Sequence, residues 1–182
     1  MSENHNTTEN ANAFPYRLRI DTFRKFSIVR FPSDSYIFNV LCDYSQKTLK
    51  DGFLSLTRTS KEISIIQNAK YAPYPEGFDE DLAKQVKVEK EFLMIEVVPV
   101  VGEQIDFGKD NFKITADLVA VTGLLAKLAR TLAKQKVAIF AISTFDTDYI
   151  LIKDDDLLAA VDGFAEESIQ YSVDFQDMNT EV

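Results

Sequence analysis

The chain has 182 residues, a formal net charge of −9 at pH 7, 46% hydrophobic residues and a single cysteine. This length and apolar content predict one ordinary globular domain or two small ones packed together, and they exclude a disordered chain. The acidic balance argues against nucleic-acid binding, because phosphate contacts require clusters of Lys and Arg, and no apolar run reaches the roughly 20 residues of a membrane span. The lone Cys42 excludes an internal disulfide and suits a reducing compartment. We therefore expect a cytoplasmic protein with neither a nucleic-acid nor a membrane partner.

The first residues carry little that could form a core. Residues 1–15 are rich in Asn, Thr and Glu and poor in apolar side chains, which predicts a disordered tail without the apolar core of a signal peptide. The only histidine, His5, lies in this tail. A metal site or a catalytic histidine is therefore not expected.

The first ordered half, from Tyr16 to Val88, alternates apolar and polar residues over short runs, as strands with one buried face do. Pro32 ends the second run, and Ser33 or Asp34 is placed to cap a following helix. The expected elements are strands over 17–20 and 25–31, a short helix after Asp34, a hairpin of 53–58 and 62–66, a loop over 71–77, and a short helix over 78–85 capped by Asp79.

The second half contains the strongest helix signal of the chain. Apolar residues recur at i, i+3 and i+4 from Leu124 to Ala133, with basic side chains outside that stripe. Pro99 ends a strongly apolar strand before it, and Asp154 to Asp156 are placed to cap the last helix. The expected elements are a strand over 92–98, a loop over 100–113, a helix over 122–136, strands over 137–142 and 149–152, a helix over 157–164, and a strand over 169–175.

This order of strand, helix, strand, strand, helix, strand is that of the ferredoxin-like βαββαβ motif, and the first half shows a weaker version of it. We therefore expect an α+β fold of two ferredoxin-like modules packed side by side, with antiparallel sheets and helices on one face. The predicted modules span 16–88 and 89–176, and a short tail over 177–182 follows.

Two segments resemble a known family. LSLTRTSKEISII (54–66) and TGLLAKLARTLAKQKVAIFAISTFDTDYILI (122–152) resemble tandem ACT-domain proteins, including small two-module members and CASTOR-type arginine sensors. The resemblance extends from Tyr16 to about Ile169. It implies amino-acid-binding regulatory modules that pair side by side, with ligands at a module interface near the loop before the first helix. Because CASTOR-type sensors carry four modules and this chain two, it also implies a homodimer.

An amino acid needs N–H donors for its carboxylate, which a helix N-terminus supplies, and carboxylates or carbonyls for its ammonium. Thr122-Gly123 opens the 122–136 helix, and the glycine allows close approach of a ligand or of backbone. By the resemblance, the contacts lie in the loop and first turn of this helix and on the two strands that follow. The implied ligand-binding residues are Leu118, Val121, Thr122, Gly123, Leu124, Leu125, Ala138, Ile139, Thr144, Phe145 and Asp148.

The loop before that helix departs from the sensors. The run from Leu118 to Val121 stands where they carry a Gly-Phe-Asp-Glu pattern, so valine replaces an acidic side chain that could face a cationic ligand. We therefore expect a less charged ligand than arginine, bound through backbone groups. The alternative is an ACT-fold dimerisation or interaction module with no physiological ligand. Asp146 and Asp148 would then simply cap a hairpin turn. We expect Gly123 to be a close-packing glycine that also serves the site.

The sequence contains no pattern that indicates catalysis. It has no Gly-rich phosphate loop, no zinc-ligand spacing and no activated nucleophile, so we expect no enzyme activity, no cofactor and no metal. An enzyme that uses carboxylates alone would need a deep cleft lined by several acids.

Overall fold

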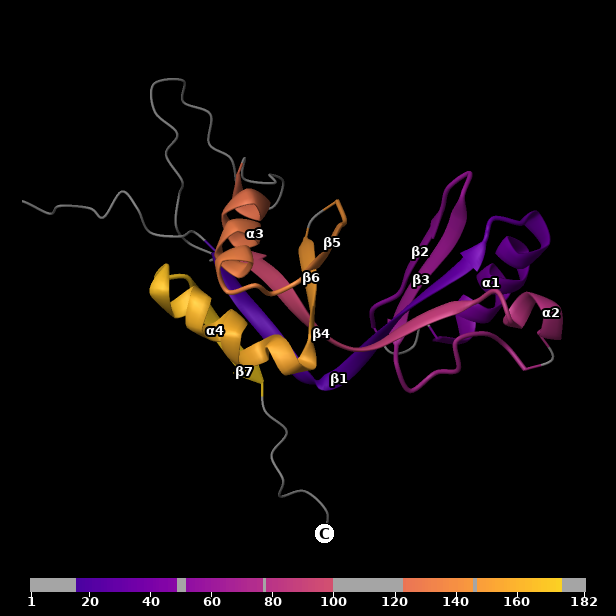
Figure 1. The fold of residues 1–182 in the computed structure, drawn as a ribbon, viewed down its shortest axis with the longest axis horizontal. Coiled ribbons are helices and arrows are strands. Elements are labelled where there is room, and N and C mark those ends of the chain that lie inside the picture. The colour runs from indigo at the N-terminus through magenta and orange to yellow at the C-terminus, as the bar shows by residue number, and fades with distance from the viewer. Residues whose placement is uncertain (1–15, 49–51, 77, 100–122, 146, 175–182) are drawn as a thin grey trace, which may run out of the picture.

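The computed structural model describes residues 16–48, 52–76, 78–99, 123–145 and 147–174, so the predicted tails and the predicted loop over 100–113 lie outside the described residues. Within these ranges seven strands form one sheet, in the order β2-β3-β1-β4-β6-β5, with β7 paired to β1 (Figure 1). The elements are β1 (Tyr16–Pro32), α1 (Ser35–Thr48), β2 (Ser55–Arg58), β3 (Glu62–Asn68), α2 (Glu80–Ala83), β4 (Lys87–Pro99), α3 (Leu124–Lys134), β5 (Phe140–Ser143), β6 (Asp148–Lys153), η2 (Asp154–Asp156), α4 (Leu157–Glu166) and β7 (Gln170–Asp174).

Two ferredoxin-like modules share this sheet, which confirms the predicted α+β fold. In the first module β2, β3, the C-terminal half of β1 and the start of β4 lie side by side, all antiparallel. In the second module β4, β6 and β5 form the corresponding antiparallel set. Helices α1 and α2 cover the first module, and α3 and α4 cover the second (Figure 1). The predicted boundary between residues 88 and 89 falls inside β4 and stays a prediction.

The last strand is placed differently from that of an isolated βαββαβ unit. There β7 would pair with β4, but here it pairs in parallel with β1, with Leu18 opposite Tyr171. The N-terminal half of β1 therefore lies between β4 and β7. The first strand of the chain completes the second module.

The runs predicted as two strands, 17–20 and 25–31, form one strand with a bulge, so the break predicted between them is wrong. The Asp21 carboxylate accepts backbone N–H bonds from Phe23 at 2.9 Å and Arg24 at 3.3 Å, which replace the lost ladder bonds. Asp21 pairs with Met94 and Phe26 pairs with Phe92, so β1 advances five residues where β4 advances two. The three extra positions interrupt the apolar alternation without ending the strand.

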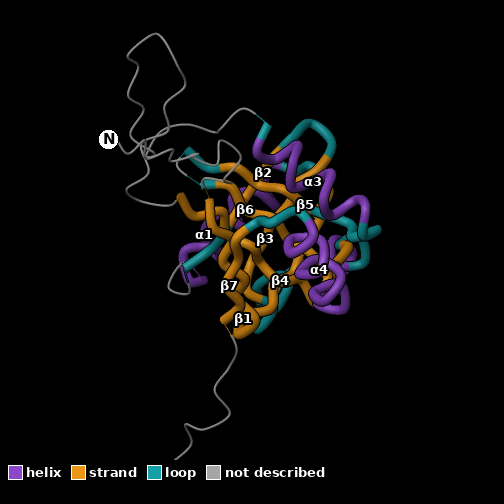
Figure 2. Tube along the Cα trace, turned by 90° about the vertical axis from the view of Figure 1, so that its left-hand side faces the viewer, coloured by secondary structure: helices purple, strands orange, loops and turns teal. Residues whose placement is uncertain are grey.

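This bulge decides which face each half of β1 presents to the helices. Before it, Leu18 and Ile20 are buried under α3 and α4; after it, Val29 and Phe31 are buried under α1. An odd number of inserted residues exchanges the two faces of a strand, so even positions face the helices before the bulge and odd positions after it. Glu91, with φ of 62°, marks a matching irregularity in β4. All four labelled helices consequently lie on the outer face of the curled sheet, as predicted (Figure 1). Figure 2 gives the perpendicular view, from the side of α3 and α4.

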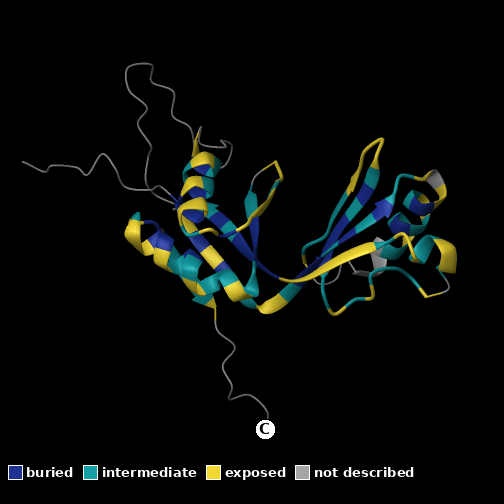
Figure 3. Ribbon diagram, viewed as in Figure 1, coloured by how far each residue is buried: buried dark blue, intermediate teal, exposed yellow. Residues whose placement is uncertain are grey.

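The apolar core has three parts. One lies between the second module and helices α3 and α4, and another lies between the first module and helices α1 and α2. The third lies on the helix-free face where the modules meet, and it includes Phe26 and Ile66 from the first module and Met94 and Leu151 from the second. Figure 3 shows the buried positions along the strands of both modules. The two modules are therefore joined by packing as well as by β1 and β4.

Several element ends differ from the prediction. β4 begins at Lys87 instead of 92, because the run from Lys87 to Glu91 is almost entirely charged and gives no apolar signal. The predicted helix over 78–85 is a single turn, although Asp79 caps it as expected. No helix in the described part of the chain has the length and apolarity needed to cross a membrane.

The predicted cap of the last helix is wrong. Asp154 to Asp156 form a turn of 3-10 helix that leads directly into α4. Asp156 already has helical backbone angles (φ −88°, ψ −1°), and its side chain makes no capping hydrogen bond. A cap requires a non-helical residue whose side chain folds back onto the first turn, and Asp156 does not meet that condition. Asp154 instead pairs with Lys25 at 2.5 Å.

Candidate functional site

Hydrogen bonds between Thr144 and Thr147 close the β5–β6 turn. The Thr144 backbone N–H and hydroxyl both donate to the Thr147 carbonyl, at 2.9 and 3.0 Å. The Thr147 N–H donates back to the Thr144 hydroxyl at 3.1 Å. Thr144 is therefore engaged in the turn, while Phe145 stands at its tip with 82% of its surface exposed.

Asp148 begins β6 beside the helix-covered core. Alternation along β6 puts its side chain on the same face as Ile150 and Ile152, which are buried under α3 and α4. Burial, and secondly the negative charge of Asp148, raise the pKa of the Tyr16 phenol. Within the described residues no N–H group donates to the Asp148 carboxylate, so Thr144 and not Asp148 holds the turn. Asp146, the other predicted turn aspartate, lies outside the described residues.

The start of α3 depends on the conformation of one glycine. Gly123 has φ of 90°, a left-handed angle that residues with a Cβ rarely adopt, and its carbonyl accepts from the Lys127 N–H at 2.8 Å. A Cβ at this position would meet no heavy atom of the described residues within 4 Å. Its left-handed angle therefore accounts for a glycine here, and the described residues show no close packing against it.

The other predicted ligand-binding residues around the start of α3 differ in how far they are buried. Leu124 is 5% exposed in the core and Leu125 packs against that core, so neither side chain offers a polar group at the helix start. Ala138 and Ile139 are exposed in the segment before β5. Leu118, Val121 and Thr122 lie outside the described residues. Figure 1 shows α3 beginning at the same end of the second module as the β5–β6 tip, and the ligand contacts stay a prediction.

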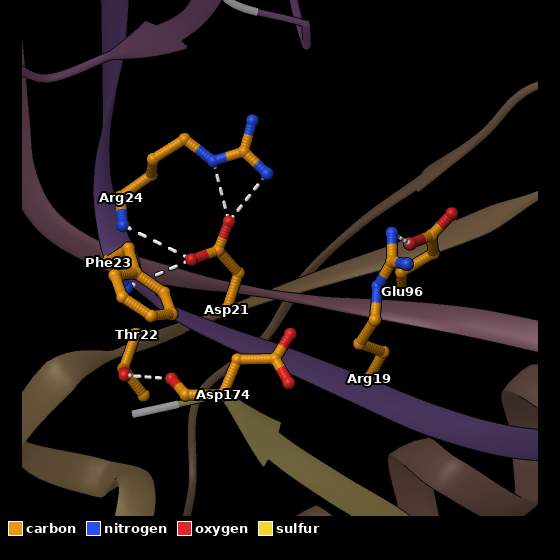
Figure 4. Close-up of polar contacts among 7 residues, drawn as sticks. All are labelled: Arg19, Asp21, Thr22, Phe23, Arg24, Glu96 and Asp174. Carbon is orange, nitrogen blue, oxygen red and sulfur yellow. Dashed lines mark hydrogen bonds and ion pairs between the residues drawn. The ribbon is translucent and has the colours of Figure 1, made fainter. Parts of the chain in front are cut away.

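A pocket of about 400 Å³ lies on the opposite, helix-free face, beside the β1 bulge. Arg19 pairs there with Glu96, and the Asp21 carboxylate accepts from both Nε and Nη2 of Arg24 at 2.6 Å (Figure 4). The lining residues are Arg19, Asp21, Phe23, Arg24, Met94, Glu96 and Asp174. Sequence reasoning did not predict this pocket. Its one local signal is the break in apolar alternation after Ile20.

Acidic side chains are not grouped for metal binding. Across the described ranges, no three His, Cys, Asp or Glu side chains lie close enough to hold a metal ion.

Residues 110–163 match the sequence profile of the ACT domain family. This range contains all eleven residues predicted to bind ligand. No curated protein sequence matches the chain.

Three solved structures are similar over most of the chain. Protein Atu0741 from Agobacterium tumefaciens is 21% identical, with 90% of this chain and 97% of that protein covered, at a TM-score of 0.58. The ligand-free regulatory subunit of aspartate kinase from Thermus thermophilus is 12% identical, with 86% and 97% covered, at 0.53. VC0802 from Vibrio cholerae, a protein of unknown function and possible transport protein, is 14% identical, with 85% and 91% covered, at 0.51. At these identities the similarity shows the fold.

Proposed function

We propose that the protein is an amino-acid-binding regulatory protein of the ACT type, which senses its ligand at a module or subunit interface. The observation that carries this proposal is the ACT match over 110–163, because it includes the start of α3 and the whole β5–β6 hairpin. The similarity to a regulatory subunit of aspartate kinase, whose fold accounts for nearly the whole chain, supports a role without a catalytic domain.

The chemistry at the start of α3 suits the carboxylate of an amino acid. Backbone N–H groups of the first helical turn have no partner within the helix, and the helix dipole favours negative charge there. No heavy atom of the described residues would lie within 4 Å of a Cβ at Gly123, which supports room for the approach. Asp148 is the nearby acid we propose for the ligand ammonium. The buried Leu124 and the partly buried Leu125 offer no charge for a ligand side chain, which favours an uncharged amino acid over arginine.

A thermal-shift screen of the twenty amino acids tests this proposal. A ligand at about one hundred times its dissociation constant should stabilise the protein by roughly 2.7 kcal/mol. Asp148→Ala should abolish the shift, whereas Asp155→Ala, which removes an exposed aspartate from η2, should retain it. If no amino acid moves the melting temperature, the sensing proposal fails. If Asp148→Ala binds like the wild type, the site assignment fails.

We further propose that the protein is a homodimer paired along β5. This strand is one end of the sheet order, so one of its edges has no neighbouring strand among the residues that the structure describes. Apolar side chains are exposed along it and beside it: Ile139 at 37%, Phe140 at 39% and Phe145 at 82%. Pairing two such edges would join the sheets of two copies and bury these side chains. Phe140→Lys should yield a monomer in light-scattering measurements, and a wild-type monomer would contradict the proposal.

The same exposed side chains favour the alternative function, an ACT-fold dimerisation or interaction module with no physiological ligand. The two functions differ in one measurable respect. An interaction module keeps its dimerisation constant unchanged in every amino acid tested, whereas a sensor shows a constant that depends on its ligand.

A further inference from the structure

The pocket beside the β1 bulge brings together three strands that are distant in sequence. Asp21 of β1 lies opposite Asp174 of β7 on one side and Met94 of β4 on the other. Because β1 is inserted between β4 and β7, side chains from all three strands point into one space (Figure 4). Its volume of about 400 Å³ is within the usual range of small-molecule sites.

The charges in this pocket do not cancel. Arg19 is paired with Glu96, and Arg24 is paired with Asp21, so both cations already have a carboxylate. Among the described lining residues the remaining charged group is Asp174, which is exposed. Its backbone carbonyl accepts the Thr22 hydroxyl, while its carboxylate points toward the centre of the group and has no ion pair or hydrogen bond within the described residues (Figure 4). Among the described lining residues two arginines stand against three carboxylates, so the excess charge is negative and favours a cationic ligand.

The remaining lining selects the kind of cation. Phe23 is 51% exposed and Met94 is almost buried at 7%, so the pocket offers an aromatic ring and a thioether besides the carboxylate. Hard metal ions require about six oxygen ligands, and one free carboxylate does not supply them. An alkylammonium or guanidinium group can pair with Asp174, contact the Phe23 ring and place its carbon chain on Met94.

The protein holds this arrangement in place before any ligand binds. The Asp21 carboxylate fixes the Phe23 and Arg24 backbones through two N–H bonds and the Arg24 side chain through two more. Phe23 is therefore held by a closed turn, so binding of a ligand costs little additional conformational entropy.

We propose that this pocket is a binding site for a small organic monocation, an alkylammonium or alkylguanidinium, with Asp174 as its counterion and Phe23 as its aromatic wall. The site is separate from the proposed amino-acid site. Glu96 and Met94 face the helix-free side of β4, whereas Asp148 faces the helix-covered side of β6.

Titration of the full-length protein with n-butylammonium and butylguanidinium, followed by backbone amide NMR, tests this proposal. Both probes should shift the amides of Phe23, Met94 and Asp174, while n-butanol and butyrate should not. Asp174→Asn should weaken binding by about tenfold or more, the equivalent of one charge-assisted contact. Phe23→Leu should weaken it by about two- to fivefold. Raising the ionic strength to about 1 M, where the Debye length is roughly 3 Å, should weaken it further.

Two matched variants make the outcome decisive. Asp155→Asn removes the same charge from an exposed position in η2 and should leave the affinity unchanged, as should Asp148→Ala. Equal affinity in Asp174→Asn, or binding of butyrate as tight as that of butylammonium, overturns the proposal. It is also overturned if the probes shift the amides of Leu124 and Asp148 instead, because the cation then occupies the helix-covered side.

Discussion

Phe53, in the segment before β2, packs edge-on against Tyr149 of β6, with ring centroids 4.9 Å apart and an interplanar angle of 62°. Phe53 also meets Phe26 of β1 at 6.0 Å and 90°. The contact with Tyr149 crosses from the first module to the second on the helix-free face, next to the buried Leu151. Because the modules share this core and the strands β1 and β4, we expect them to unfold as one cooperative unit.

Replacement of Phe53 tests that coupling. Phe53→Leu keeps an apolar side chain but removes the edge-to-face contacts, and it should lower the free energy of unfolding by about 1 kcal/mol. Urea denaturation followed by circular dichroism and by tyrosine fluorescence should show one coincident transition for wild type and variant. Tyr36→Leu, at a position that is 65% exposed, should change stability by less than about 0.5 kcal/mol. Two separate transitions in the wild type would contradict the shared core.

Asp34 and Asp156 form a matched pair of helix-start aspartates. The Asp34 carboxylate accepts N–H bonds from Tyr36 at 2.7 Å and Ile37 at 3.1 Å, whereas the Asp156 side chain makes no capping bond. Asp34→Ala should therefore destabilise the protein by about 1 kcal/mol, and Asp156→Ala by much less. Urea unfolding midpoints at constant slope measure both. Equal losses would show that charge near the helix dipole, and not the capping bond, is the source of the effect.

The structural features predicted best from sequence are those that depend on residues close together along the chain. The Asp34 cap, the Thr144 to Asp148 turn and the apolar stripe of α3 each follow from local spacing, and the structure contains all three. The insertion of β1 between β4 and β7 could not be predicted, because strand pairing between Leu18 and Tyr171 leaves no local pattern in either segment. The Asp21 bulge cannot be told from a strand break in the sequence for a related reason: a bulge and a loop interrupt the apolar alternation alike.

The candidate sites divide in the same way. Gly123 and the β5–β6 turn could be found from sequence, because a glycine before an apolar stripe and a hydroxyl-rich turn are local signals. The closeness of Asp148 to Tyr16, and of Asp174 to Asp21, results from strand order. Neither segment taken alone carries a sequence signal for this closeness.

Gly163 marks the contact between α4 and α3. A Cβ there would lie 2.8 Å from Cγ of Gln135 and 3.3 Å from the Thr131 methyl group. Alanine normally favours a helix over glycine by about 1 kcal/mol, but overpacking costs about 1 to 3 kcal/mol. Gly163→Ala should therefore be net destabilising by about 1 kcal/mol. Gln135→Ala in that background removes the closest clash and should recover most of the loss, as measured by thermal unfolding. Stabilisation by Gly163→Ala alone would show that the two helices separate freely.

Tyr16 and Asp148 give a pH-dependent test of the geometry at the proposed amino-acid site. Burial and, secondly, the Asp148 charge raise the pKa of Tyr16 above its ordinary value of 10.0. A raised pKa means that the folded protein holds the phenol proton more tightly than the unfolded chain. The resulting stability is fully present below pH 10.0 and is lost as the pH rises through the folded pKa. Tyr16→Phe should flatten that alkaline decline.

Asp148→Asn should lower the Tyr16 pKa only part of the way, because it removes the smaller cause and leaves the burial. The titration of the Tyr16 ring carbon, assigned by comparison with Tyr16→Phe, measures this by NMR. Asp155→Asn removes an equal charge from η2 and should leave the midpoint in place. An unchanged midpoint in Asp148→Asn would mean that Asp148 does not face the start of β1, and the placement of the ligand ammonium would have to be abandoned.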